Sequence, residues 1–434
     1  MSSVHRYRVF CETEQTNMYT WDTLQPTVCP NNNTHTINSN SIVIVDNINT
    51  SQTEITNLNS DNTQTLQTIQ KNVIITLPPY MGVSLLRNNV ITTGSGTISN
   101  NPVTESEINL NCSGANDSCT LRSIDRGIYI AGLTCEVGVA MRMPSPLTGN
   151  QVLKWGYFSN QNGFYFKLTS TDFQVCIMNN SVELCISQSN FNVDKLDGNG
   201  ISSANIDFTK GNIFRILFSW YGYGLVSFEM VGTSKNGQQS NLCMHQYQTV
   251  GKTSTRIPNL PIQVIFGNNG TVANTSVFVA GRSFSILGQY TENIREVSMY
   301  KYLASISNEV FLPIFSIKRK TQYIGCTVTL SEIYIKSSVD CELQIISRAT
   351  LTSTIWEENP HHSETVVEID KTSNTVNGGL TLYSMIIFAN ETREHSFEDT
   401  LMQINEMKPI TIIAKSLTGE SGNVTVKLGY KEYW

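Results

Sequence analysis

The stretch GFYFKLTSTDFQVCIMNNSVELCIS, residues 163–187, decides the fold class of this chain. Apolar side chains alternate with other residues in three short runs, at Phe164, Phe166 and Leu168, at Phe173, Val175 and Ile177, and at Val182, Leu184 and Ile186. Alternation at period two places one set of side chains on one face of a β-strand. Asn, Ser and Thr between the runs favour turns. The stretch therefore predicts three strands joined by short turns.

The same pattern extends in both directions from this stretch. It repeats at Ile216, Phe218 and Trp220, and it resumes after residue 289 and continues to Leu428. Many short strands with turns between them are typical of β-sandwiches and jelly rolls. The prediction is an all-β chain with two antiparallel β-sandwich or jelly-roll-like domains, preceded by a small N-terminal module and a polar connector. These four segments are the module at 1–45, the connector at 46–72, the central sandwich at 73–285 and the C-terminal sandwich at 286–434.

Composition agrees with a β-rich chain and disfavours two classes of partner. The 434 residues are 40% hydrophobic and 15% charged, and the formal net charge is −6. An acidic balance without a basic run argues against nucleic-acid binding. No stretch reaches the roughly 18 apolar residues of a membrane span, and the polar start has no apolar core of a secretion signal. We therefore expect a soluble chain made in the cytoplasm, with most of its ten cysteines as buried thiols.

The N-terminal module is too small to bury a large core of its own. It contains Cys11, Cys29 and His35, to which His5 adds a further candidate ligand. Such a soft ligand set suits a tetrahedral zinc ion, although the spacing is not that of a standard zinc finger. A Cys11–Cys29 disulfide and plain packing of these side chains are the two alternatives.

The connector carries sparse aliphatic residues in an otherwise polar sequence. Ile48, Ile55, Leu58 and Ile69 fall partly at coiled-coil intervals, which would make residues 46–72 a short oligomerising helix. Asn and Thr are poor helix formers, so a flexible polar linker fits this composition equally well.

The loop at 192–200 holds two carboxylates that fit either of two roles. Asp194 and Asp197 lie among Asn and Gly residues, so they provide oxygen atoms for calcium, or they form ordinary hairpin turns. The spacing is not that of an EF-hand. The sequence contains no HExxH, GxSxG, GxGxxG or Walker motif, which argues against an enzyme and against a nucleotide cofactor.

Aromatic and proline residues are expected to fix the folds of the module and the central domain. Trp21 and Pro30 are the candidate anchors of the module, and Trp155 and Trp220 are candidate core residues of the central sandwich. Residues of this kind determine a fold and do not mark a catalytic pocket.

Two sets of motifs resemble structural proteins of large double-stranded DNA viruses and some phages. The module carries RVFCETE at 8–14 and PTVCPNNNTHTI at 26–37, which are similar to the N-terminal module of such proteins. The ordered series in the central domain is similar to a virion-protein sandwich; it consists of WGYF at 155–158, FNVDKLDGNG at 191–200, WYGYG at 220–224 and PNLP at 258–261. Together these matches cover a little over half of the chain.

The resemblance implies a non-enzymatic virion structural protein that is anchored by its N-terminal module. It would be a vertex, fibre or penton-type protein or a minor capsid component, located in the virion and assembled in the host cytoplasm. Its expected partners are other capsid proteins and further copies of itself, as a trimer or a pentamer. The alternative is a glycan-binding or glycan-degrading host-attachment protein.

Overall fold

The computed structural model describes most of the chain outside residues 45–70. The described ranges are 5–22, 24–30, 32–44, 71–100, 106–233, 239–288, 294–307, 310–323, 325–359, 364–397, 402–404, 409–433. The chain divides into two compact units, Met1–Thr68 and Ile69–Trp434. The helix or linker expected at 46–72 lies outside the described residues, except that Lys71 and Asn72 begin a strand.

The described residues form an all-β protein, which confirms the predicted fold class. All paired strands are antiparallel, and the described helices are single 3₁₀ turns, at Ser39–Ser41, Pro79–Met81, Gln188–Asn190 and Thr321–Tyr323. No helix among the described residues has the length and apolar character of a membrane span.

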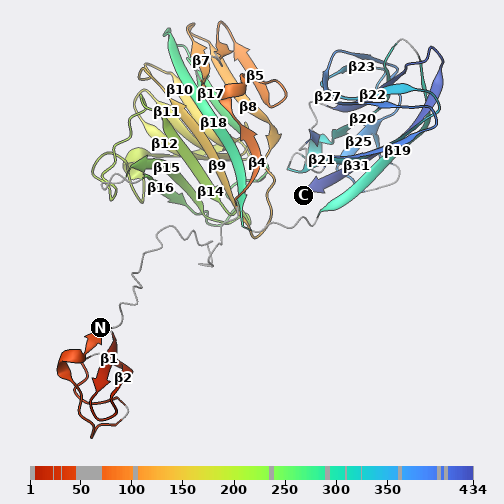
Figure 1. The fold of residues 1–434 in the computed structure, drawn as a ribbon. Helices are drawn as coiled ribbons and strands as arrows, with labels where there is room; N and C mark the ends of the chain where they lie inside the picture. Colours follow the sequence, from red (N-terminus) through yellow and green to blue (C-terminus); the bar gives the residue numbers. More distant parts are fainter. Residues whose placement is uncertain are drawn as a thin grey trace. The chain divides into compact units, whose positions relative to one another are not determined.

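The N-terminal module contains one three-stranded sheet (red in Figure 1). Its strand order is β2-β1-β3, with bounds His5–Cys11 for β1, Thr16–Asp22 for β2 and Val43–Ile44 for β3. Tyr7 and Val9 point into a small apolar centre together with two cysteines. The sheet is thus too small to provide much hydrophobic stabilisation.

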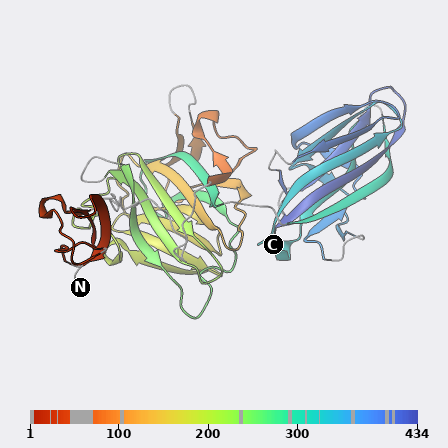
Figure 2. The same cartoon turned by 60° about the horizontal axis from the view of Figure 1, so that its bottom comes forward.

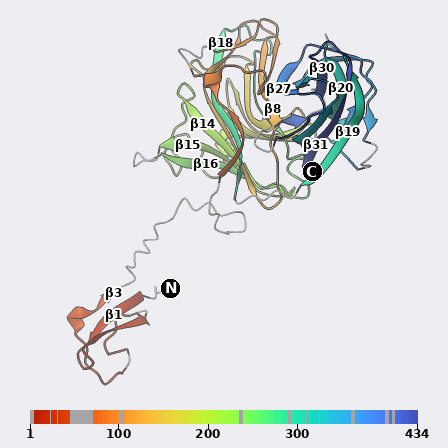
Figure 3. The same cartoon turned by 45° about the vertical axis from the view of Figure 1, so that its right-hand side comes forward.

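The central domain is a sandwich of two large sheets (Figures 1 and 3). The first sheet has the order β13 (Val182–Ser187), β12 (Phe173–Asn179), β11 (Gly163–Thr169), β10 (Val152–Phe158), β17 (Pro261–Gly267), β8 (Ser118–Arg126), β5 (Asn88–Thr93). The second has the order β16 (Gln239–Tyr247), β15 (Val226–Thr233), β14 (Asn212–Phe218), β9 (Thr134–Arg142), β18 (Thr275–Leu287), β7 (Ile108–Cys112), β6 (Thr97–Ser99), and β4 (Lys71–Leu77) also pairs with β18. The alternating residues of the two inner faces fill one continuous core.

Trp155 lies at the centre of this core and is fully buried. Its ring stacks on Phe166 and Phe173 at centroid distances of 5.5 and 6.0 Å, and it meets Phe214 edge-on at 4.9 Å. Its Nε1 has no hydrogen-bond partner among the described residues. Trp155 is therefore a packing residue, as the sequence predicts.

An ion cluster of the buried Glu136 and Arg215 with the exposed Lys71 joins the strand that follows the connector to the second sheet. Glu136 on β9 accepts hydrogen bonds from Lys71 Nζ on β4 and from Arg215 Nη2 on β14, each at 2.7 Å. Burial alone would raise the pKa of Glu136, but the bonds from Arg215 and Lys71 lower it. The start of β4 is thus fixed by charge as well as by strand pairing.

Two cysteines in the first sheet form a disulfide that was not among the expectations from the sequence. Cys176 on β12 and Cys185 on β13 face each other and are bonded. Of the eight free cysteines, seven are buried and Cys243 is half-buried. The expectation of buried thiols therefore holds for most of the cysteines but not for this pair.

The C-terminal domain is a second sandwich with its own core (blue in Figure 2). One sheet has the order β19 (Arg295–Ile306), β31 (Gly422–Tyr433), β21 (Thr327–Ser337), β28 (Thr392–Ser396), with β29 (Gln403–Ile404) also paired to β21. The other has the order β24 (Glu357–Glu358), β25 (Val367–Asp370), β20 (Leu312–Arg319), β30 (Ile410–Ser416), β22 (Cys341–Ser347), β27 (Leu380–Ile387). A short pair, β23 (Thr350–Thr352) and β26 (Thr375–Asn377), completes the domain.

Candidate functional site

Four side chains of the N-terminal module converge on one point. Cys11 ends β1, Glu14 lies in the turn that follows, and Cys29 and His35 lie in the segment after β2. One potential ligand atom from each, two sulfurs, a carboxylate oxygen and a ring nitrogen, lies within 4.8 Å of the other three. The structure thus brings together the three residues expected from the sequence and adds Glu14. The side chain of His5 is outside the described part of the chain.

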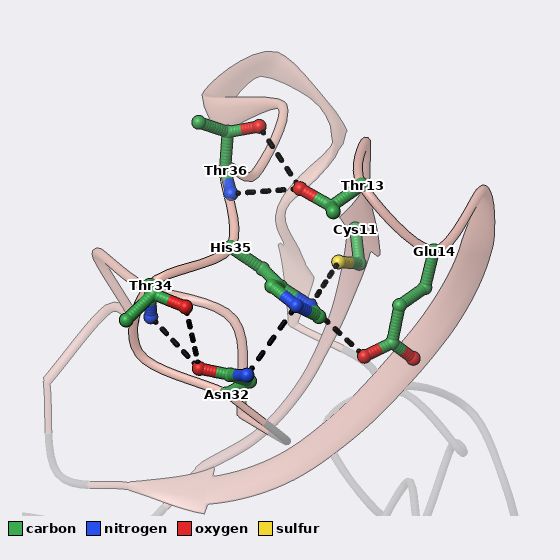
Figure 4. Close-up of polar contacts among 7 residues, drawn as sticks. All are labelled: Cys11, Thr13, Glu14, Asn32, Thr34, His35 and Thr36. Atoms are coloured by element: carbon green, nitrogen blue, oxygen red, sulfur yellow. Dashed lines mark hydrogen bonds and ion pairs between the residues drawn. The ribbon is translucent and has the colours of Figure 1, made fainter.

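The backbone holds these residues together through two connected loops. Asn32 N donates to Cys29 O, and His35 N donates to Asn32 O, so two successive turns return the chain to the level of Cys29. Thr36 N donates to Thr13 Oγ1 at 3.2 Å, which ties this segment to the β1–β2 turn (Figure 4). The positions of the four side chains therefore follow from turn geometry and not from a large core.

His35 has a defined orientation within the cluster (Figure 4). Its Nδ1 lies 2.9 Å from Glu14 Oε1 and 3.8 Å from Cys11 Sγ. On the other side, Asn32 Nδ2 lies 3.3 Å from Nε2, and Asn32 Oδ1 accepts bonds from the backbone and hydroxyl of Thr34. Asn32 therefore turns its NH₂ group toward the ring, so Nε2 accepts a hydrogen bond from Asn32 Nδ2 and Nδ1–H donates to Glu14.

Opposing influences act on the ionisation of the Cys11 thiol. Cys11 and Cys29 are buried, with exposed fractions of 0% and 2%. Burial raises the pKa of Cys11, and the neighbouring Cys29 raises it further, whereas backbone N–H groups of Glu14 and Thr13 donate to the sulfur and lower it. The thiol is therefore neutral on its own, but its surroundings already contain donors that stabilise a thiolate.

The two carboxylates of the loop at 192–200 serve separate turns. Asp194 is buried, and it accepts bonds from Leu196 N at 2.9 Å and from Ser202 N at 2.7 Å. Asp197 Oδ1 accepts from Asn199 N at 2.9 Å. Such contacts to nearby backbone N–H groups are typical of a structural turn, and they favour a turn over a calcium site in this loop.

The remaining anchor candidates occupy different environments. Trp220 is half-buried, and its Nε1 donates to Thr255 O at 2.9 Å. Pro30 is exposed and directly follows the buried Cys29. Trp21 lies on β2, and its side chain is outside the described part of the chain.

A pocket of about 730 Å³ opens at one end of the central sandwich, and no sequence motif indicated it. It lies where the β11–β12 turn meets the segment that precedes β14, and Met143 N fixes this segment by donating to Phe208 O at 2.7 Å. Its apolar lining residues are Met143, Pro146, Leu147, Leu168, Phe173, Ile206, Phe208. Its polar lining residues are Thr169, Ser170, Thr171, Asp172, Gln188, Asn205, Asp207, Thr209, Lys210.

Two carboxylates of the pocket are held by hydrogen bonds. Asp172 Oδ2 accepts from Ser187 Oγ at 2.6 Å and from Gln174 Nε2 at 2.9 Å. Asp207 Oδ1 accepts from the hydroxyl and the backbone N–H of Thr209, and these bonds lower the pKa of Asp207. The pocket thus combines an apolar floor with oriented hydrogen-bonding groups at its rim.

Among the comparisons with known proteins, only the comparison with solved structures finds matches. No protein-family model matches the chain, and no curated protein matches it. Similar structures include the Emp47p carbohydrate recognition domain (14% identity, TM-score 0.31, covering 49% of this chain and 95% of that one) and the legume lectin-like domain from Entamoeba histolytica (12%, TM-score 0.30, 45% and 89%). The CBM2 module of the evolved Dit of Lactobacillus casei BL23 phage J-1 is also similar (7%, TM-score 0.33, 52% and 99%).

Proposed function

We propose that this chain is a non-enzymatic structural component of a virus or phage particle, attached to the particle by its N-terminal module. The observation that carries this proposal is that residues 1–68 form a compact unit of their own, apart from the unit that contains both sandwiches. Within this unit, hydrogen bonds hold two loops together around four side chains, those of Cys11, Glu14, Cys29 and His35. The resemblance of the motifs at 8–14 and 26–37 to virion proteins supports the same role. A small separate unit of this kind suits binding to the particle, which would leave the two sandwiches exposed to solvent.

The experiment for attachment compares incorporation of two chains into particles in the infected host. A chain that lacks residues 1–45 should keep the thermal unfolding transitions of both sandwiches, because their cores contain no residue of the module. It should nevertheless be absent from purified particles. Incorporation of the truncated chain at the normal copy number would refute attachment through the module.

A second function, glycan binding by the central sandwich, is favoured by the pocket beside Phe173 and Phe208. Sugars present apolar ring faces and many hydroxyl groups, which match an apolar floor and a rim of carboxylates, amides and hydroxyls. We propose binding alone, because the pocket provides apolar side chains and hydrogen-bonding groups.

The test of glycan binding uses one blocking variant and one matched control. Thr171 is exposed at the pocket, so Thr171→Arg should fill the opening and leave the core unchanged. Val272 is 80% exposed and outside the pocket, so Val272→Arg adds the same charge to the same domain. On a glycan array, the native chain and the control should bind the same sugars, and Thr171→Arg should not. Equal binding by all three chains, or by none, would refute a sugar site in this pocket.

A further inference from the structure

We propose that Cys11, Glu14, Cys29 and His35 bind one zinc ion, through the two sulfurs, a carboxylate oxygen of Glu14 and Nδ1 of His35. This inference does not depend on the proposed function, because the four residues lie together whatever the module attaches to. It concerns the module alone and uses no residue of the sandwiches.

The distances within the cluster are close to the edges of a zinc tetrahedron. With Zn–S of about 2.3 Å, and Zn–N and Zn–O of about 2.1 Å, sulfur and nitrogen ligands stand roughly 3.6 Å apart, and nitrogen and oxygen roughly 3.4 Å. Nδ1 of His35 lies 3.8 Å from Cys11 Sγ and 2.9 Å from Glu14 Oε1. These two distances lie within about half an ångström of the tetrahedral values, and the remaining distances between the ligand atoms are no greater than 4.8 Å.

The chemistry of the ligands selects zinc over the common hard cations. Thiolate and imidazole prefer zinc, whereas calcium and magnesium prefer sites made of oxygen atoms. Two thiolates, one imidazole and one carboxylate also provide the four ligands that a tetrahedral zinc ion takes.

A disulfide between Cys11 and Cys29 explains less of the geometry. It would leave His35 and Glu14 facing the sulfurs without a role there. It would also leave the backbone N–H groups of Thr13 and Glu14 directed at a sulfur that carries no charge. Donors of this kind stabilise a metal-bound thiolate.

Zinc binding has a definite proton balance. Both thiols release a proton to solvent, and the proton on Nδ1 of His35 is displaced, so that the neutral ring carries its proton on Nε2. Nε2 then becomes a donor, and the side chain of Asn32 has to turn its oxygen toward it. The bound site has a formal charge of −1, from Zn²⁺, two thiolates and one carboxylate.

The module has a structural need for such a site. Among its described side chains, the buried hydrophobic ones are Tyr7, Val9, Cys11 and Cys29. Two of these four are proposed ligands, so little apolar area remains to hold the two loops. Binding of a structural zinc ion contributes directly to the free energy of folding in domains of this size.

The test measures the metal content and the ligand set of the full-length chain. Purification without chelators should give one zinc per chain by elemental analysis. Replacement of zinc by Co²⁺ should produce a thiolate-to-cobalt charge-transfer band and the intense visible bands of tetrahedral cobalt. These measurements need no variant, so they do not depend on whether a variant folds.

Variants then assign the ligands. Cys29→Ser and His35→Ala should lose the metal, whereas Glu14→Gln, which keeps an oxygen atom at this position but removes its charge, should bind the metal more weakly than the native chain. Cys243→Ser is the matched control, because Cys243 is a free cysteine outside the module, and it should keep one zinc per chain. A chain without metal, with or without a Cys11–Cys29 linkage in peptide maps of alkylated protein, would overturn the proposal. A cobalt spectrum without the charge-transfer band would overturn it as well.

Discussion

Two substitutions of Trp155 separate the packing of the central core from its one unsatisfied polar group. The indole ring is fully buried between aromatic neighbours, and its Nε1 has no partner among the described residues. Trp155→Ala removes both the ring and this N–H group. Trp155→Phe removes the N–H group but keeps an aromatic ring in place.

The magnitudes follow from these contacts. Trp155→Ala should lower the free energy of unfolding by about 3–5 kcal/mol, because a large cavity remains in a close-packed core. Phe has three fewer heavy atoms than Trp, so packing is lost in Trp155→Phe as well. An unpaired buried donor costs about 1–3 kcal/mol, and removing it offsets most of that loss. The expected net cost of Trp155→Phe is about 0–2 kcal/mol.

The same core supports the pocket, so the two variants should also differ in binding. Phe173 and Phe208 line the pocket, and their ring centroids lie 6.0 and 6.3 Å from that of Trp155. Trp155→Ala should weaken any glycan binding that Thr171→Arg abolishes, and Trp155→Phe should preserve it.

The assay is urea denaturation of the full-length chain with pulsed hydrogen exchange, followed by mass spectrometry. Peptides from β10 and β11 report unfolding of the central sandwich separately from the C-terminal one. Equal losses of stability in the two variants would refute the reasoning, since they would mean that Nε1 contributes a favourable bond.

Three further predictions concern charge and backbone in the central domain. Burial raises the pKa of Asp125 from 3.8 to about 6, so the ionised carboxylate opposes folding at higher pH. Asp125→Asn should therefore raise the free energy of unfolding by about 3 kcal/mol at pH 8 and leave it unchanged below about pH 4. Urea titrations at the two pH values would show this difference. Glu136→Gln should cost about 1.5–3 kcal/mol at pH 7, because Arg215 and Lys71 lose a charged hydrogen-bond partner while Arg215 keeps Glu229 at 3.3 Å. The pKa of Glu136 is lowered, so the stabilisation that its carboxylate provides should disappear as the pH falls below about 4.3. A difference in unfolding free energy between the native chain and Glu136→Gln that does not change with pH would contradict this assignment. A Cβ on Gly200 would overlap Asp194 Oδ1, and the carboxylate is held in place because each of its oxygens accepts one backbone bond, so Gly200→Ala should lower stability by about 1–3 kcal/mol in calorimetry.

The sequence predicts the strands well where their pattern is local. Phe164, Phe166 and Leu168 alternate along β11 and belong to the sandwich core, whereas Tyr165, between them, is buried in a smaller cluster with Phe158 and Cys176. The order of strands depends on contacts that no local pattern encodes. For example, Trp155 on β10 pairs with Val264 on β17, more than a hundred residues later.

The disulfide shows a signal that was present in the sequence but needed the turn to be recognised. Asn180 and Ser181 both have positive φ, at 49° and 67°, and form a two-residue hairpin loop. In such a hairpin, residues at equal distances from the loop face each other. Cys176 and Cys185 stand at equal distances from it. Recognition of the two-residue turn would therefore have predicted the pair.

Prediction of the candidate metal centre was incomplete for a similar reason. Three residues stand out in the sequence because residue types that commonly bind metals fall together in one short module: Cys11, Cys29 and His35. Glu14 does not stand out, because carboxylates are frequent on surfaces, and only the turn after β1 brings it to His35. The pocket could not be predicted from sequence either, since its walls come from segments that meet through sheet packing.

The position of the disulfide has a consequence for how the central sandwich responds to a pulling force. β13 is the end strand of its sheet, and a force applied to the chain beyond Ser187 would peel it from β12, starting at the Ser187–Gln174 pair. The covalent bond at Cys185 lies two residues further along, so peeling stops there. The pairs from Leu184 to Val182 then carry no tension, although Val182 is 64% exposed and has little packing to resist it. Pulling force is thus passed from the end strand into the interior of the sheet, and a reducing environment would remove this protection without altering the fold at rest.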